Sequence, residues 1–154
     1  METCHRDSQE PRPLMKKNEP IAKVMSTELV TIRHGEPVSQ ARKLMIEHDV
    51  HHLPVVSGDE LIGVISWSDI LRLSFADALG SDDRAVDATL DHSFTLEQVM
   101  SADPITISSH HGTVREAAEI LAKGKFHALP VVDGKNLVGL VTSSDLLRYL
   151  ADLF

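Results

Sequence analysis

Two nearly identical decapeptides, GVISWSDILR at 63–72 and GLVTSSDLLR at 139–148, constrain the fold of this chain more than any other feature. Around them, VMSTELVTI (24–32) aligns with VMSADPITI (99–107), and HHLPVVSGDELIGVI (51–65) aligns with HALPVVDGKNLVGLV (127–141). Gly139 follows Gly63 by 76 positions, and Met100 follows Met25 by 75, so the second copy has one extra residue. A repeat of fixed period predicts two copies of one supersecondary unit.

Within each copy the local pattern predicts the order β-α-β-β-α. In each copy a short apolar strand precedes a segment with helical spacing, at 38–45 and at 114–121. The first of these helices should end near His48–Asp49 and the second at Gly124. The segments LPVV and LIGVI form one predicted hairpin, and LPVV and LVGLV form the other. The last helix should begin near Ser68 or Ser144. We therefore expect an α/β fold of two pseudo-symmetric β-α-β-β-α repeats packed as one module.

The composition along the chain divides it into four segments. Residues 1–18 lack a hydrophobic period and are expected to form a flexible tail, and residues 19–73 form the first repeat. Residues 74–94 are acidic and contain Gly and Ser, which favours a solvated connection that could also contact a partner or control access to a cleft. Residues 95–154 form the second repeat, which begins with Thr95 and a short helix in TLEQVM.

The charge and the cysteine content exclude several classes of partner. The formal net charge of −8 argues against nucleic acid or an anionic membrane surface, because both bind basic surfaces. The single cysteine, Cys4, allows no intramolecular disulfide, and no apolar run approaches the ~18 residues of a membrane span. These features predict a cytoplasmic protein.

The paired occurrence of VMS, HxLPVV and Gly-apolar-apolar-[ST]-x-x-D over residues 20–154 resembles the tandem cystathionine-β-synthase (CBS) domain, or Bateman module. The resemblance implies a non-catalytic regulatory protein that senses an adenine nucleotide or a related adenosyl ligand. It also implies assembly into a homodimer, often a flat disc of four CBS units.

The same resemblance implies two ligand clefts, each combining [ST]xxD of one repeat with the residues before LPVV of the other. The carboxylate would hold the ribose hydroxyls, and the start of the following helix would attract phosphate. Carried over by position, one cleft comprises Thr142, Ser143, Asp145, Val50, His51 and His52, and the other comprises Ser66, Asp69, Phe126, His127 and Ala128.

Each of these residues also has a purely structural interpretation. Asp69 and Asp145 could serve only as first-turn charges that favour the helix dipole, and Ser66 and Thr142 could bond the local backbone. Trp67 could stack on a ligand, cover the first cleft or pack in a dimer interface.

Other chemistries receive little support from the sequence. His48, His51 and His52 invite a metal site, but they have no cysteine partner and no HExxH spacing, so we expect no metal. The chain has no GxSxG, GxxxxGK[ST] or GxGxxG motif, and we expect no enzyme.

The sequence thus predicts a stand-alone regulatory protein that binds AMP, ADP or ATP, with no covalent cofactor. The alternative is an interaction or oligomerisation module with no physiological nucleotide. A homodimer is expected because several apolar helix residues, namely Leu44, Met45, Leu71, Ile120, Leu121 and Leu147, should not all be covered within one chain.

Overall fold

The computed structural model of this protein describes residues 18–74 and 82–154. The predicted tail lies outside this part of the chain except for Asn18, and so does Cys4. Within the described residues, no helix is both long enough and apolar enough to cross a bilayer.

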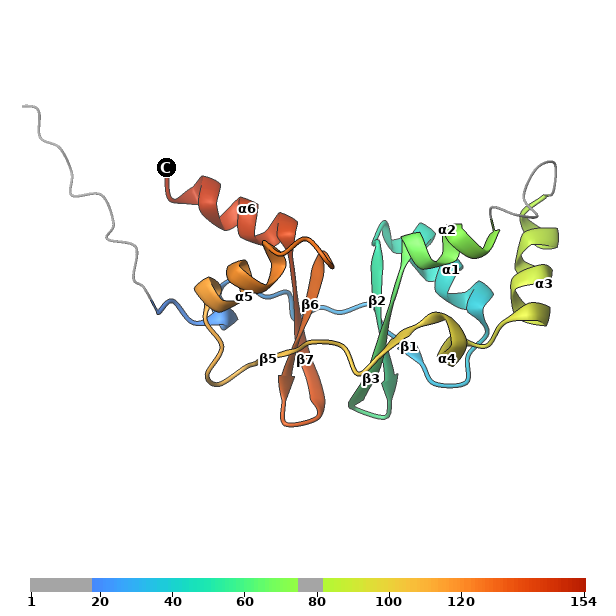
Figure 1. Cartoon of the computed structure of the whole chain (residues 1–154), viewed down its shortest axis with the longest axis horizontal. Helices are drawn as coiled ribbons and strands as arrows, with labels where there is room; N and C mark the ends of the chain where they lie inside the picture. The colour runs from blue at the N-terminus through green and yellow to red at the C-terminus, as the bar shows by residue number, and fades with distance from the viewer. Residues whose placement is uncertain (1–17, 75–81) are drawn as a thin grey trace, which may run out of the picture.

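The two repeats share the series strand, helix, strand, strand, helix (Figure 1). The first repeat contains η1 (Ile21–Lys23), β1 (Ile32–Arg33), α1 (Val38–His48), β2 (His52–Ser57), β3 (Glu60–Ser66) and α2 (Trp67–Ser74). After α3 (Asp83–Ser93), the second repeat contains α4 (Leu96–Val99), β4 (Ser101–Ala102), β5 (Ile107–Ser108), α5 (Val114–Leu121), β6 (Ala128–Asp133), β7 (Asn136–Thr142) and α6 (Ser143–Asp152). The prediction of two β-α-β-β-α units is confirmed.

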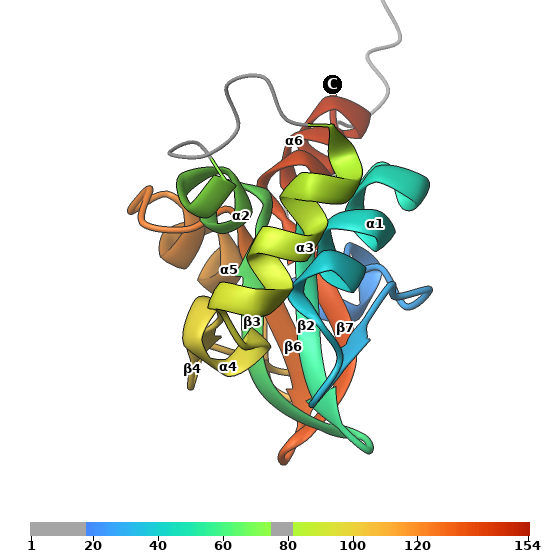
Figure 2. The same cartoon turned by 90° about the vertical axis from the view of Figure 1, so that its right-hand side faces the viewer.

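Each repeat is built on an antiparallel hairpin with a short parallel strand beside it. Val55 pairs with Gly63 in the first hairpin, and Val131 pairs with Gly139 at the equivalent place in the second. The two hairpins join at their tips, where Glu60 pairs with Asn136. The sheet order is therefore β1-β2-β3-β7-β6-β5, with β4 added beside β3. In Figures 1 and 2 the hairpins form the centre, with α1 and α2 outside one and α5 and α6 outside the other.

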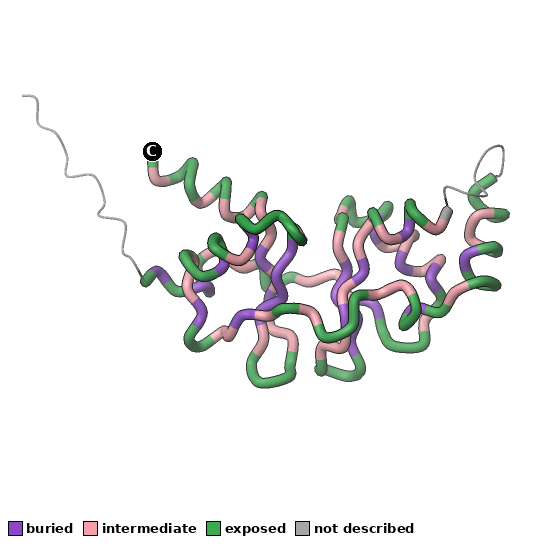
Figure 3. Tube along the Cα trace, in the orientation of Figure 1, coloured by how far each residue is buried: buried purple, intermediate pink, exposed green. Residues whose placement is uncertain are grey.

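The buried residues form one hydrophobic cluster in each repeat, which Figure 3 shows as buried segments inside the helices and along the hairpins. The LPVV strands supply both clusters: Leu53 and Val55 are fully buried in the first, and Leu129 and Val131 in the second. The continuous apolar runs arise because both faces of these strands are covered, one by helices and one by the other repeat.

The glycine of each repeated decapeptide lies beneath a segment of the opposite repeat. A Cβ atom added at Gly139 would lie 2.7 Å from Met25 Sδ, and one at Gly63 would lie 2.5 Å from Met100 Sδ. Ser26 and Leu140 exchange backbone hydrogen bonds of 2.9 and 3.0 Å, and Ser101 pairs with Val64. The VMS segment of each repeat therefore crosses onto the strand of the other.

Several predicted helix boundaries need correction. Helix α1 ends at His48 as expected, with Asp49 in the left-handed region at φ 51°. Helix α5 ends at Leu121, three residues before Gly124, whose φ of +72° lies in the turn that follows. Helices α2 and α6 begin one residue before Ser68 and Ser144.

The expectation of a solvated connection is wrong for residues 83–93, which form α3. Asp82 caps this helix by accepting a hydrogen bond of 2.8 Å from the Ala85 N–H. Leu90 is only 2% exposed and belongs to the core of the first repeat. The acidic side chains that suggested a solvated segment occupy the faces that do not enter this core.

As expected, the apolar helix residues named above are not all covered within one chain. Met45 and Leu121 are buried, and Leu44 and Ile120 are partly buried against the two cores. Leu71 and Leu147, which occupy equivalent positions in α2 and α6, are 45% and 65% exposed.

Candidate functional site

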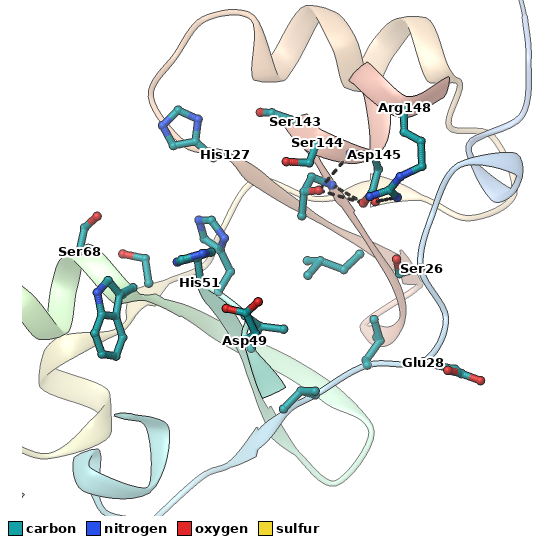
Figure 4. Close-up of a pocket in the computed structure, with 18 residues that line it drawn as sticks. Ser26, Glu28, Asp49, His51, Ser68, His127, Ser143, Ser144, Asp145 and Arg148 are labelled. Atoms are coloured by element: carbon teal, nitrogen blue, oxygen red, sulfur yellow. Dashed lines mark hydrogen bonds and ion pairs between the residues drawn. The ribbon is translucent and has the colours of Figure 1, made fainter. Parts of the chain in front are cut away.

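A cleft of about 690 Å³ lies between the two repeats (Figure 4). Its walls come from the segment before β1, the residues that join α1 to β2, the ends of β3 and β7, and the first turns of α2 and α6. The lining residues are Ser26, Glu28, Leu29, Val30, Asp49, Val50, His51, His52, Ser66, Trp67, Ser68, His127, Leu140, Thr142, Ser143, Ser144, Asp145 and Arg148.

One wall is the corner where β7 ends and α6 begins. Thr142 is the N-cap of α6, and its Oγ1 accepts a hydrogen bond of 3.2 Å from the Asp145 N–H. Asp145 Oδ2 in turn accepts from the Thr142 N–H at 2.9 Å and from its hydroxyl at 3.0 Å. Asp145 Oδ1 is 3.3 Å from Arg148 Nη1. The threonine and the aspartate of the motif therefore form a capping box.

The equivalent corner of the first repeat has the same geometry. Asp69 Oδ2 accepts from the Ser66 N–H at 2.9 Å and from the Ser66 hydroxyl at 2.8 Å, and Ser66 Oγ accepts from the Asp69 N–H at 3.2 Å. Asp69 Oδ1 forms an ion pair with Arg72. Ser66 lines the cleft, whereas Asp69 and Arg72 are not among its lining residues.

The structure brings one complete set of the predicted site residues to this cleft, namely Thr142, Ser143, Asp145, Val50, His51 and His52. Of the other predicted set, Ser66 and His127 line the same cleft, and Asp69, Phe126 and Ala128 do not. Phe126 packs against the second core and Ala128 is 6% exposed, so both serve the interior of the second repeat. Trp67 lines the cleft beside Ser66.

Several lining residues are absent from the sequence prediction, chiefly Ser26, Glu28 and Arg148. The pairing of Ser26 with Leu140 brings the segment that contains Glu28 to the second repeat. No local pattern marks this crossing, because it joins strands of different repeats. Arg148 could have been found, since it follows Asp145 by three positions on a helix and therefore shares its face.

The charged side chains that line the cleft are Glu28, Asp49, Asp145 and Arg148, so anionic groups outnumber the cation. Three histidines, His51, His52 and His127, line the cleft as well. The pKa of His52 is lowered, first by burial and then by its electrostatic interaction with His127 and His51, while Asp69 opposes this shift. His52 is therefore held in its neutral form, in which the ring both donates and accepts hydrogen bonds.

Residues 18–74 and 82–154 include no group of three or more His, Cys, Asp or Glu side chains placed to hold a metal ion.

Two of the backbone N–H groups at the start of α6 already have partners within the chain. The Ser143 N–H donates to the His127 carbonyl at 3.0 Å, and the Asp145 N–H donates to the Thr142 hydroxyl. Ser144, the second residue of α6, also lines the cleft.

Comparison with known proteins gives the family. The CBS domain matches residues 21–76 and again residues 96–152. The inosine-5'-monophosphate dehydrogenase of Korarchaeum cryptofilum is 32% identical over 120 residues, which are 77% of this chain and 22% of that enzyme. This chain thus spans about a fifth of the length of that relative.

Two solved structures share the fold. CBSX2 in complex with AMP superposes with a TM-score of 0.71 at 24% identity, covering 88% of this chain and 98% of that one. The CBS domain pair of protein MJ0100, in complex with 5'-methylthioadenosine and S-adenosyl-L-methionine, superposes with a TM-score of 0.71 at 26% identity, with the same coverage. The two family matches, the repeated β-α-β-β-α unit and these neighbours agree, and the chain belongs to the CBS domain family as a tandem CBS pair.

Proposed function

We propose that this CBS pair binds an adenine nucleotide in the cleft between its repeats and acts in the cytoplasm, as a homodimer, as a non-catalytic sensor of energy state or metabolite level. The observation that carries the proposal is the convergence of the Thr142–Asp145 corner with residues 50–52 on one cleft. The relatives that were solved with AMP, or with methylthioadenosine and S-adenosylmethionine, support an adenosyl ligand.

The chemistry of the cleft suits each part of such a ligand. Asp145 offers carboxylate oxygens to the ribose hydroxyls, which is a strong, charge-assisted interaction. The backbone of Val50, His51 and His52 offers donors and acceptors for the edge of adenine. The first turn of α6, with Ser144 and Arg148, provides the positive end of a helix dipole and a guanidinium for phosphate.

Asp145 can accept a ribose without breaking the helix cap, because its two oxygens have different partners. Oδ2 accepts hydrogen bonds from the N–H and the hydroxyl of Thr142, whereas Oδ1 interacts with Arg148 at 3.3 Å. The Arg148 side chain is 73% exposed, and an exposed ion pair of this kind contributes about 0–1 kcal/mol. A ribose hydroxyl would therefore replace Arg148 on Oδ1 at little cost, and the released guanidinium would be free to bind phosphate.

The charge of the cleft favours AMP among the three nucleotides. Glu28 and Asp49 line it together with Asp145, and like charges in one cleft repel a polyphosphate. Arg148 is the cationic partner on the wall of α6, and one guanidinium matches one phosphate better than three. We therefore propose the affinity order AMP, ADP, ATP.

A second function is favoured by one observation. The capping boxes at the starts of α2 and α6 are formed by Ser66 with Asp69 and by Thr142 with Asp145. The glycines of the same motifs, Gly63 and Gly139, leave room for the crossing segments. These motif residues therefore have structural roles without a ligand. On this interpretation the chain is an interaction or oligomerisation module with no physiological nucleotide.

Thermal melting with a ligand panel separates the two functions. A ligand at 100 times its dissociation constant stabilises the native state by about 2.7 kcal/mol. The panel comprises AMP, ADP, ATP, adenosine, S-adenosylmethionine and, as a base control, GMP. A rise in melting temperature with AMP and not with GMP supports the sensor. No rise with any adenosyl compound at millimolar concentration supports the module without nucleotide.

A further inference from the structure

The helices of the first repeat are covered by α3, which belongs to the segment that precedes the second repeat. Figure 2 shows α3 lying over α1 and α2. Leu90 of α3 is 2% exposed and belongs to the same buried cluster as Met45 of α1 and Ile70 of α2. A polar contact fixes α3 on α1, where Arg42 Nη1 donates to Asp87 at 3.1 Å. The segment before one repeat therefore completes the core of the other repeat.

The equivalent face of the second repeat is an open groove of about 640 Å³ between α5 and α6, and Leu121 and Leu146 are among the residues that line it. By the offset of 76 positions, these two leucines are the equivalents of Met45 and Ile70. Ile70 is 1% exposed, whereas Leu146 is only partly buried. Leu147, which also lines the groove, is 65% exposed. The groove thus exposes apolar surface of the kind that α3 covers in the first repeat.

The described part of the chain begins beside this groove. Glu19 lines the groove, and its carbonyl accepts a hydrogen bond of 2.8 Å from the Val114 N–H at the start of α5. Two residues later, Ile21 is fully buried in the second core. The residues that precede Glu19 are therefore tethered at the edge of the groove.

The alignment of the repeats gives these preceding residues the same place as α3. The two VMS segments are related by an offset of 75 positions, and by this offset Ile21 corresponds to Leu96. Leu96 is buried in the first core, just as Ile21 is buried in the second. Met15 corresponds in the same way to Leu90, and Leu14 precedes it in the otherwise polar stretch PRPLMKKN. An apolar pair therefore occupies the sequence position at which α3 inserts its leucine into the first core.

The distance along the chain is short enough for this pair to enter the groove. Met15 precedes Glu19 by four positions, which an extended chain spans with up to about 14 Å. Helix α6 has 10 residues and is therefore about 15 Å long. From its tether at Glu19, Met15 can reach most of the length of the groove.

We infer that Leu14 and Met15 fill the α5/α6 groove of their own chain, in the place that Leu90 has in the first repeat. Pro11 and Pro13 are incompatible with the interior of a helix such as α3, so the occupant is a short apolar anchor. The inference does not depend on nucleotide binding. Any partner of this face, including a second copy of the chain, would first have to displace the anchor.

Disulfide trapping in the full chain tests the position of the anchor. The background is Cys4→Ser, which removes the only cysteine. Met15→Cys is combined either with Leu147→Cys, in the groove, or with Glu119→Cys, on α5 outside the groove lining. The Glu119 side chain is 64% exposed and lies as near to the tether, so it is the matched control. A disulfide needs two Cα atoms within about 7 Å, and we expect the Leu147 pair to close at least tenfold faster.

The products of the trapping are separated by mass without reducing agent. The inference requires an internally linked chain that keeps the mass of 17.0 kDa. Equal rates for the Leu147 and Glu119 pairs would mean that the segment is only tethered nearby, which overturns the inference. A linked product of twice the chain mass would overturn it as well, because the segment would then fill the groove of another copy.

Thermal melting provides a second test without cysteines. The double variant Leu14→Asp, Met15→Asp should lower the melting temperature by about 4–8 °C, because the groove loses two apolar side chains. The double variant Thr3→Asp, Ser8→Asp adds the same charge to the same segment and should leave the melting temperature unchanged. Equal melting temperatures for the two double variants would overturn the inference. AMP binding, measured separately, bears on neither test.

Discussion

Asp145 and Thr142 satisfy each other's hydrogen-bonding groups: the carboxylate accepts from the N–H and hydroxyl of Thr142, and the hydroxyl accepts from the Asp145 N–H. The repeated [ST]xxD motif is therefore a helix start in both repeats. Only one of its two carboxylates, that of Asp145, lies on the cleft. This difference allows the structural role of the motif to be separated from a role in ligand binding.

Asp145→Ala and Asp69→Ala form the first pair of tests. Both remove a capping box of nearly the same geometry, so each should lower the free energy of unfolding by about 1–2 kcal/mol. Asp145→Ala should also lower AMP affinity ten- to a hundredfold or abolish measurable binding, because a charged partner of the ribose is lost. Isothermal titration calorimetry measures the affinity, and denaturant unfolding measures the stability.

The two variants together make this test decisive. Asp69→Ala should retain AMP affinity close to wild type, because Asp69 does not line the cleft. Undiminished AMP binding by folded Asp145→Ala would show that the motif serves only the helix starts.

Arg148→Gln tests the proposed exchange of partners. Because the Arg148 side chain is 73% exposed, stability should change by less than about 1 kcal/mol. AMP affinity should fall about tenfold or more, whereas adenosine affinity should change little, since adenosine has no phosphate. Arg72→Gln is the matched control, because Arg72 pairs with Asp69 away from the cleft. Equal losses for AMP and adenosine would instead mean that Arg148 only positions Asp145.

Gly139→Ala probes the contact between the repeats. The new methyl group would meet Met25 Sδ and, at 3.2 Å, the Ser26 carbonyl, and overpacking of this kind costs about 1–3 kcal/mol. Met25→Ala removes the sulfur from that contact. The double variant should therefore be more stable than the sum of the single effects predicts. Additive losses of unfolding free energy in this double-mutant cycle would contradict the contact.

His52 should make stability depend on pH. Its pKa is lowered from the ordinary value of 6.5 in the folded protein, so below that value the unfolded chain binds the proton more readily. This contribution to stability is fully present above about pH 6.5 and is lost as the pH falls through the lowered folded pKa. His52→Gln should reduce the loss of unfolding free energy on acidification, and His111→Gln, at an exposed loop position, should not. Identical pH profiles for wild type and His52→Gln would rule out this role.

The elements that could be predicted are those determined by neighbouring residues. The turn at Asp133–Gly134 predicts its hairpin, and a serine followed by Asp at Ser68 and at Ser144 predicts helix starts within one residue of the observed ones. The helix boundaries are less certain because several caps compete locally: Ser68 and Ser144 resemble N-caps, but Thr142 is the residue whose side chain accepts the hydrogen bond.

The features that the sequence does not reveal depend on contacts between distant segments. Ser26 and Glu28 reach the cleft because their segment pairs with the other repeat, and nothing near them in sequence specifies this pairing.

Helix α3 does have a local signal in the sequence, since Val86, Leu90 and Phe94 recur every four residues. Its many aspartates nevertheless favoured the interpretation of a solvated segment. The histidines 51 and 127 could be recognised as equivalent, whereas the burial of His52 between the repeats could not.

The crossing of Met25 over Gly139 also affects how the chain folds. These residues are separated by 114 positions. The segment with Met25 can therefore pack on the second hairpin only after the two distant parts of the chain have come together. Contacts between residues so far apart in sequence slow folding, because the entropy of loop closure must be lost before the contacts form. Since Met100 covers Gly63 in the reciprocal direction, each repeat completes the surface of the other. We therefore expect the pair to fold and unfold as one cooperative unit, although its sequence consists of two similar halves.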